Sequence, residues 1–179
     1  MAASVGRDER HRLFLGILLP ADAAEALADW QASELRGRIV PRGNLHITLA
    51  FLGWRPPGEL PAIVDALGRA AADSRPLRFE VAGYRETRSV GMLTLDDEDG
   101  AAAGLARRLH DDLEELGVYR REARPWLPHV TVLRFRERPR LRPEPPALGW
   151  VSSDAAAFLS RLHPSGARYE VHDSFRLGG

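Results

Sequence analysis

Residues 44–49 read Asn-Leu-His-Ile-Thr-Leu and residues 128–133 read Pro-His-Val-Thr-Val-Leu, so one His-apolar-Thr-apolar pattern occurs twice, about half a chain length apart. Side chains alternate between the two faces of a β-strand. A strand with this pattern therefore buries its apolar pair and presents its His-Thr pair on the other face. Two half-chains that share the pattern predict a pseudo-twofold fold in which both His-Thr pairs face one cleft.

Short runs typical of strands and longer runs typical of helices follow one another along the rest of the chain. The predicted strands are residues 12–19, 44–52, 77–82, 90–95, 128–135, 154–162 and 168–175. The predicted helices are residues 22–35, capped by Asp22, and the segments around residues 60–67 and 105–116. This order predicts an α+β or an α/β chain. No linker divides it, so we expect one domain over residues 1–179, with residues 1–10 disordered.

The composition excludes several kinds of chemistry. The 179 residues include no cysteine, which excludes disulfides, thiolate catalysis and cysteine-based zinc sites. All 25 basic residues are arginine, so the nucleotidyl-lysine step of an ATP-dependent ligase has no lysine to use. The formal net charge is +0, so any contact with nucleic acid must be local. No apolar run approaches the roughly 18 residues of a membrane span. We expect the protein to be cytoplasmic and, as is usual for a protein of this size with a cleft, monomeric.

The paired histidines suit the cleavage of a phosphodiester. One imidazole can activate the nucleophile while the other protonates the leaving oxygen, because a pKa of about 6.5 allows both protonation states near neutrality. Threonine hydroxyls can donate hydrogen bonds to the phosphate oxygens between them. Such a site needs no metal. From the pattern alone, two partly exposed strand histidines without a catalytic role remain the alternative.

Further residues around the two tetrapeptides complete a known pattern. These are Arg12-Leu13-Phe14 and Leu19-Pro20, residues 44–53 and 128–134, and Ser160, Gly166 and Tyr169 near the end of the chain. Together they resemble the two-histidine phosphoesterase superfamily, and more closely its RNA 2′,3′-cyclic phosphodiesterases, long labelled 2′-5′ RNA ligases. The resemblance covers most of the chain. It implies a bilobed fold of antiparallel sheets that face a central cleft, with the helices on the outside.

The resemblance also implies roles for individual residues. It assigns His46 and His129 as the catalytic pair, and Thr48, Thr131 and Arg134 as phosphate ligands. Arg134 lies five residues after His129 and would face away from it in a regular strand, so we expect a bulge or strand end near Leu133. Phe14 and Trp54 are candidates for stacking on a base, with core packing as the alternative. The family uses no metal and no cofactor.

The function implied is hydrolysis of RNA 2′,3′-cyclic phosphate ends to 2′-phosphomonoesters, with His129 as base and His46 as acid. Two alternatives remain: 2′-5′ RNA ligation by the same site, and an RNA-end-binding module without turnover. The substrate would be RNA or a small nucleotide with a 2′,3′-cyclic phosphate. The arginine-rich residues 136–142 are either a solvated loop or a flexible basic arm that holds the RNA backbone.

Overall fold

The computed structural model describes residues 11–179, so the disorder predicted for residues 1–10 falls outside it. Nine strands occur within this range: β1 (His11–Leu18), β2 (Arg38–Ile39), β3 (His46–Arg55), β4 (Leu77–Glu86), β5 (Val90–Asp96), β6 (His129–Arg134), β7 (Gly149–Ser152), β8 (Asp154–Arg161) and β9 (Arg168–Arg176). The helices are α1 (Ala21–Glu34), α2 (Leu60–Ala72) and α3 (Ala101–Glu115), with two 3₁₀ turns, η1 (Arg42–Asn44) and η2 (Pro57–Glu59).

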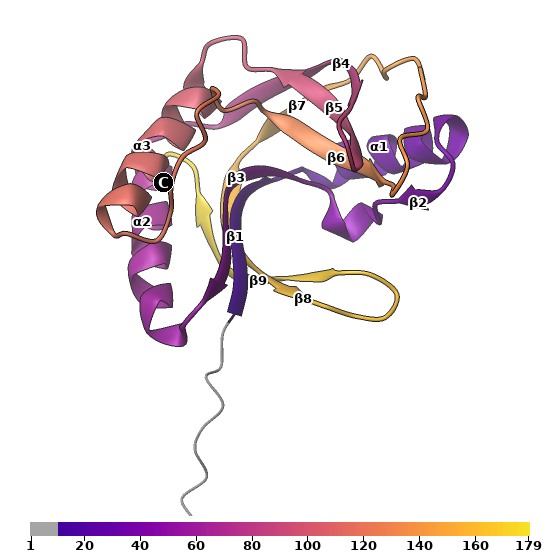
Figure 1. The fold of residues 1–179 in the computed structure, drawn as a ribbon. Helices are drawn as coiled ribbons and strands as arrows, with labels where there is room; N and C mark the ends of the chain where they lie inside the picture. The colour runs from indigo at the N-terminus through magenta and orange to yellow at the C-terminus, as the bar shows by residue number, and fades with distance from the viewer. Residues whose placement is uncertain (1–10) are drawn as a thin grey trace, which may run out of the picture.

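The strands form one antiparallel sheet made of two halves. The strand order is β7-β4-β5-β6-β3-β1-β8-β9, and β2 pairs with β6 beside that path. Strands β6 and β3 join the halves through the pair Ile47 and Val130. We call β7, β4, β5, β6 and β2 the β6 half, and β3, β1, β8 and β9 the β3 half. The two halves curl toward one another (Figure 1), which confirms the predicted α+β fold of antiparallel strands.

Burial fixes which face of each strand points into the core. The apolar members of both tetrapeptides, Ile47, Leu49, Val130 and Val132, are at most 1% exposed. Full burial of one such side chain stabilises the fold by about 1.5–3 kcal/mol relative to exposure. A register slip would expose these side chains, so their burial holds the His-Thr pairs on the opposite face.

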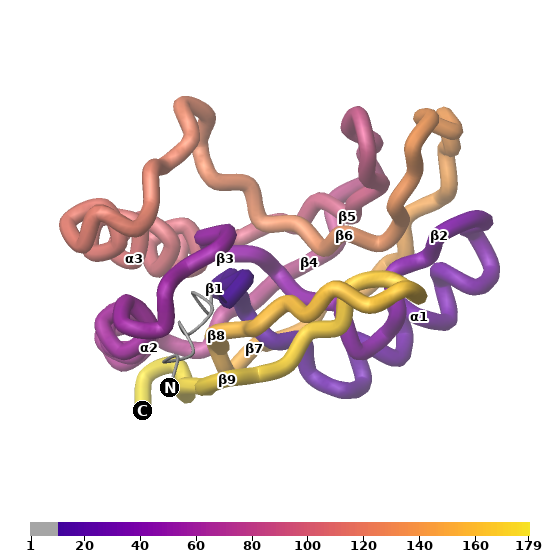
Figure 2. The backbone as a smooth tube through the Cα atoms, turned by 60° about the horizontal axis from the view of Figure 1, so that its bottom comes forward, coloured from indigo at the N-terminus to yellow at the C-terminus, as the bar shows by residue number. Residues whose placement is uncertain are grey.

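The helices cover the outside of the sheet at its two ends. Helices α2 and α3 lie together at one end and α1 lies at the other (Figures 1 and 2). Helix α1 begins at Ala21 with Pro20 at its N-cap, so the predicted cap by Asp22 is wrong. The Asp22 carboxylate instead accepts a hydrogen bond from the adjacent Ala23 N–H. No helix within residues 11–179 is both long and apolar enough to cross a membrane.

The connectivity differs from a simple duplication of half-chains. The predicted C-terminal hairpin, β8 and β9, is present, but β8 pairs with β1 at the start of the chain. The β3 half is therefore built from both ends of the chain. The two strands that the sequence did not predict, β2 and β7, have two and four residues, which is too short for a clear alternating pattern.

Candidate active site

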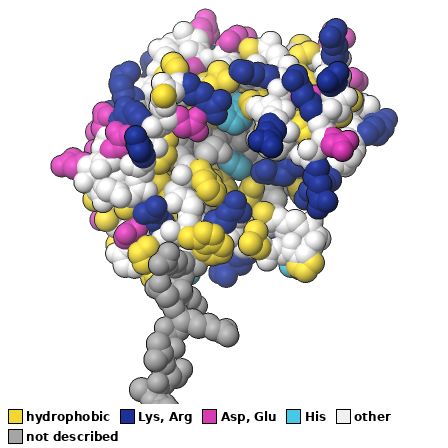
Figure 3. Space-filling view, in the orientation of Figure 1, with side chains coloured by type: hydrophobic (Ala, Val, Ile, Leu, Met, Phe, Trp, Pro, Cys, Tyr) yellow, Lys and Arg dark blue, Asp and Glu magenta, His cyan; other side chains and the backbone are white. Residues whose placement is uncertain are grey.

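The two tetrapeptides lie side by side at the junction of the halves. Ile47 pairs with Val130 in antiparallel register, which sets His46 opposite Thr131 and Thr48 opposite His129. All four side chains lie on the face turned away from the core, where each is partly exposed. Figure 3 shows two histidine side chains in a central hollow of the surface. The structure thus brings together the four residues that the repeated pattern singled out.

Both histidines are held through the same ring nitrogen. His46 Nδ1 lies 2.8 Å from the carbonyl oxygen of Asn44, and His129 Nδ1 lies 2.8 Å from that of Leu127. A carbonyl can only accept a hydrogen bond, so each Nδ1 carries a proton and each neutral ring keeps its lone pair on Nε2. His46 Nε2 accepts a hydrogen bond from the Thr48 hydroxyl at 2.9 Å.

The surroundings of His46 are aromatic. Its ring centroid lies 4.6 Å from that of Phe14, 5.7 Å from that of Phe158 and 5.4 Å from that of Tyr169. This burial, together with the nearby charges of His129 and Arg134, lowers the pKa of His46 to about 4, against the effect of the hydrogen bond to Asn44. His46 is therefore neutral near pH 7.

Gly16 of β1 makes room for this arrangement. A Cβ atom at Gly16 would lie 2.9 Å from the carbonyl oxygen of Ile47, 3.3 Å from Phe158 Cε2 and 3.4 Å from His46 Cδ2. A larger residue at this position would clash with the backbone of β3 at Ile47, next to His46.

A β-bulge follows the threonine in both motif strands. Thr48 pairs with Gly16 of β1 and Ala50 pairs with Leu15, which leaves Leu49 between them without a partner. Val132 likewise has no partner on β5, between Thr131 and Leu133. Each bulge reverses the alternation of faces, so the residue five positions after each histidine points to the cleft face. The bulge expected near Leu133 is thus confirmed, and Arg134 shares a face with His129.

The carbonyl group of each bulged residue is bonded by a buried side chain from a helix. His110 Nε2 donates to the Leu49 oxygen at 2.7 Å, and Gln31 Nε2 donates to the Val132 oxygen at 2.8 Å. Gln31 is 1% exposed, and His110 is 6% exposed. Leaving such a buried acceptor unpaired costs about 1–3 kcal/mol. Gln31 was not among the predicted site residues, although a polar residue four positions after Leu27 on an apolar helix face was a usable signal.

Arg134 and Tyr169 connect the two halves across the cleft. Arg134 Nη2 donates to the Tyr169 hydroxyl at 3.4 Å, and the edge of the Tyr169 ring meets His46. Asn44 Nδ2 also donates to the carbonyl oxygen of Ala167 in the β8–β9 turn, at 2.8 Å. These contacts hold the C-terminal hairpin against the two tetrapeptides. The sequence matched Tyr169 to the family's closing hairpin but did not place it at His46.

The two predicted base contacts lie in different surroundings. Phe14 is 3% exposed and stacks on Phe158 at 4.7 Å, whereas Trp54 is 53% exposed. Phe51, which pairs with Phe14 and shares its face, is 51% exposed. The guanidinium carbon of Arg12 lies 5.1 Å from the centre of the Phe51 ring. Phe51 was not predicted as a base contact, because regular alternation from His46 places it on the buried face.

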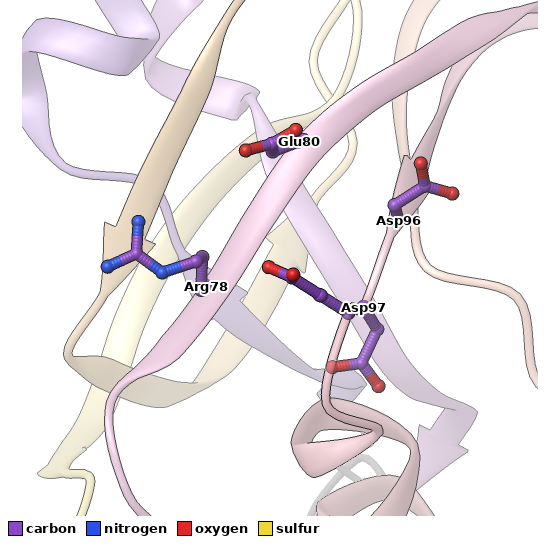
Figure 4. Close-up of a pocket in the computed structure, with 5 residues that line it drawn as sticks. Arg78, Glu80, Asp96 and Asp97 are labelled. Carbon is purple, nitrogen blue, oxygen red and sulfur yellow. The ribbon is translucent and has the colours of Figure 1, made fainter.

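A second hollow lies beyond the histidines, at the end of β4 and β5. Figure 4 shows Arg78, Glu80, Asp96 and Asp97 spread around it. The Asp97 carboxylate accepts hydrogen bonds from the N–H groups of Ala102 and Ala103, so it caps α3. Among residues 11–179, no group of three or more histidine and carboxylate side chains has an arrangement that could hold a metal ion.

Comparison with known proteins identifies the family. The model of the 2′-5′ RNA ligase superfamily matches residues 19–163. The RNA 2′,3′-cyclic phosphodiesterase of Thermus thermophilus is 30% identical, over 94% of this chain and 91% of its own. The Escherichia coli enzyme of the same name is 32% identical, over 79% of this chain and 81% of its own.

Solved structures agree with this fold. The T. thermophilus protein TT0787 superposes with a TM-score of 0.81 at 32% identity, covering 94% of this chain and 98% of that one. E. coli LigT in complex with 3′-AMP superposes with a TM-score of 0.84 at 25% identity, covering 96% of this chain and 100% of that one. The sequence match and the shared fold both extend over the tetrapeptides, and the chain belongs to the 2′-5′ RNA ligase superfamily.

Proposed function

We propose that this protein hydrolyses RNA 2′,3′-cyclic phosphate ends to 2′-phosphomonoesters without a metal ion. The observation that carries the proposal is the pair of histidines in one cleft, each fixed through Nδ1, so that in the neutral rings the lone pair for proton transfer lies on Nε2. The names of the relatives in T. thermophilus and E. coli support the same reaction.

In the proposed reaction, the basic histidine takes a proton from water as the water oxygen attacks phosphorus. The bond from phosphorus to the 3′ oxygen breaks, and the acidic histidine gives its proton to that oxygen. The prediction that His129 is the base and His46 the acid stays a prediction. In the free protein the pKa of His46 is lowered to about 4, so the acid role requires the negative charge of a bound phosphate to raise it.

Three further side chains complete the proposed phosphate site. The hydroxyls of Thr48 and Thr131 lie on the same face as the histidines and can donate to the non-bridging oxygens. Arg134 supplies a positive charge on that face, held by Tyr169. Donors that are fixed before the substrate binds stabilise the charge that develops on the phosphoryl oxygens, which is the main role of such a site.

We place the nucleoside on the β3 half. Trp54 and Phe51 present half-exposed rings on the cleft face, and exposed aromatic rings stack on bases of any sequence. Phe14 instead packs beneath His46, where it lowers the polarity around the imidazole. The monomeric state and the cytoplasmic location stay predictions.

The proposal can be tested by product analysis in EDTA. An oligonucleotide with a 2′,3′-cyclic phosphate should give only the 2′-phosphomonoester, identified by mass spectrometry and ³¹P NMR. A parallel reaction with an acceptor 5′-hydroxyl oligonucleotide detects ligation, and a binding assay without product detects a module that lacks turnover. Release of a 3′-phosphate, or a requirement for added metal, would contradict the mechanism.

A further inference from the structure

Three arginines of the β6 half, on strands β2, β4 and β6, lie on its cleft face. Arg38 of β2 pairs with Arg134 of β6, so both side chains point to the same face. Arg85 of β4 pairs with Met92 of β5, which in turn pairs with Thr131. All three guanidinium groups therefore share the face of Thr131, and we call Arg38, Arg85 and Arg134 the arginine cluster.

The charges of the arginine cluster are not neutralised. Each side chain is exposed, and none of the three forms an ion pair with any residue in the described range 11–179. By contrast, Arg69 and Arg121 outside the cleft are paired with carboxylates. Like charges directly opposite each other on neighbouring strands destabilise a sheet, and a bound anion would offset that cost.

The opposite end of the same face has a net negative charge, because the hollow there is lined by one arginine, Arg78, and four carboxylates, those of Glu80, Asp96, Asp97 and Glu98. Asp96 lies two residues after Thr94, which pairs with His129, and Glu80 pairs with Asp96, so both carboxylates lie on the cleft face. Figure 3 shows several basic side chains to the right of the histidines, whereas on the left acidic and basic side chains are interspersed. A polyanion that enters the cleft is therefore repelled at one end and attracted at the other, toward the arginine cluster.

The arginine-rich loop after β6 does not extend over the cleft. Glu86 of β4 pairs with Gly91, and its side chain points to the buried face. Its carboxylate accepts hydrogen bonds from the Arg140 and Leu141 N–H groups at 2.9 and 2.8 Å. It also accepts a bond from Arg138 Nε at 3.2 Å. The loop is thus fastened behind the sheet. The residues placed to contact a bound strand are those of the arginine cluster.

We propose that the arginine cluster binds the phosphodiester that precedes the cyclic phosphate, so that the preferred substrate is a single-stranded RNA end rather than a cyclic mononucleotide. The inference rests on the proposed function. The planar guanidinium group suits phosphate because it can donate two parallel hydrogen bonds. Arg134 would stand between the reacting phosphate and its neighbour, while Arg38 and Arg85 contact only the neighbour.

The test compares two dinucleotides that differ only in one charge. Adenylyl-adenosine 2′,3′-cyclic phosphate has a charged phosphodiester before the reacting group, and its methylphosphonate analogue has an uncharged linkage there. The wild type should show a kcat/KM about 10-fold higher for the charged substrate, which is the size of one charge-assisted contact. Arg38→Ala and Arg85→Ala should reduce this ratio toward one, because kcat/KM falls more for the charged substrate than for the analogue.

Matched variants separate this effect from general changes in charge. Arg107→Ala removes an exposed arginine of α3 and should keep the wild-type ratio. In Arg38→Ala, the slope of log kcat/KM against log salt should become shallower by about 0.7, the value for one phosphate contact of a single strand. Arg38→Lys keeps the charge and should recover part of the ratio.

Other outcomes would overturn the inference. If the wild type hydrolyses both dinucleotides equally well, the arginine cluster does not bind the preceding phosphate, while the proposed function stands. If Arg38→Ala lowers kcat/KM equally for both, Arg38 acts on the reacting phosphate or on folding. If the wild type hydrolyses neither, the proposed function fails, and this inference fails with it.

Discussion

Strands β3 and β6 carry the same backbone device with different side chains. In each strand, His-apolar-Thr is followed by a bulge, at Leu49 in one and Val132 in the other. A buried helix side chain bonds the carbonyl of the bulged residue, His110 in one case and Gln31 in the other. The pseudo-twofold relation therefore includes the irregular parts of the strands and the groups that stabilise them.

The difference lies in what each strand presents to the cleft. Five residues after the histidine, β3 presents Phe51 and β6 presents Arg134. Phe14, Phe158 and Tyr169 surround His46, whereas within residues 11–179 His129 has no such ring contact. The shared backbone places two histidines in equivalent positions. The side chains give one half an apolar surface that suits a nucleoside and the other a cationic surface that suits phosphate.

The largest expected effect comes from removing either histidine. His46→Ala and His129→Ala should each lower kcat by about 10²–10⁴-fold, because each removes one proton transfer from the transition state. His172→Ala, at an exposed histidine of β9 outside the cleft, is the matched control and should keep wild-type activity. Steady-state kinetics with a cyclic-phosphate oligonucleotide, together with circular dichroism to check folding, measures the effect. Near-normal turnover in either variant would refute its catalytic role.

The same two variants can separate the acid from the base. A cyclic phosphate in which sulfur replaces the departing 3′ oxygen needs little protonation of its leaving group. The variant that lacks the acid should therefore recover most of its activity on this substrate, whereas the variant that lacks the base should not. Recovery in His46→Ala would support the predicted roles, and recovery in His129→Ala would reverse them.

A smaller effect is expected on the titration of His46. Burial lowers its pKa from 6.5 to about 4, so between these values the unfolded chain binds a proton at this residue that the folded chain does not. His46 should therefore make the protein less stable as the pH falls from 6.5 to about 4, with no further loss from this residue below that. An NMR titration of the imidazole should give the lowered midpoint, and inorganic phosphate should raise it.

Phe158→Leu tests the physical cause of this shift. A smaller side chain uncovers part of the imidazole and should move the midpoint back toward 6.5. The effect should be seen in the NMR titration and, under urea, as a weaker pH dependence of the free energy of unfolding. A midpoint that remains near 4 in this variant would show that the ring does not cause the shift.

Much of this arrangement was predictable from local pattern. The alternation of apolar and polar residues identified the strands and the face of each His-Thr pair. With a period of two, only one face of each strand can be the buried one. The pairing of β8 with β1 was not predictable, since hydrophobic alternation is the same for any neighbouring strand. The bulge at Val132 was expected only because Arg134 had an implied role that regular alternation forbids. The corresponding bulge at Leu49 was not predicted, because no residue after it in β3 had an implied role that regular alternation forbids.

The smallest expected effect is at the aromatic surface of the β3 half. Trp54→Ala should raise KM for a cyclic-phosphate oligonucleotide about 5-fold with little change in kcat, because stacking of one base contributes about 1 kcal/mol at the low end of its range. The low end applies because the ring of Trp54 is half exposed and reaches a base from one side only. Leu116→Ala, which removes another exposed apolar side chain at the end of α3, should leave KM unchanged. Equal effects of the two variants would show that the base does not stack on Trp54. An effect on kcat alone would instead connect Trp54 to the chemistry at His46.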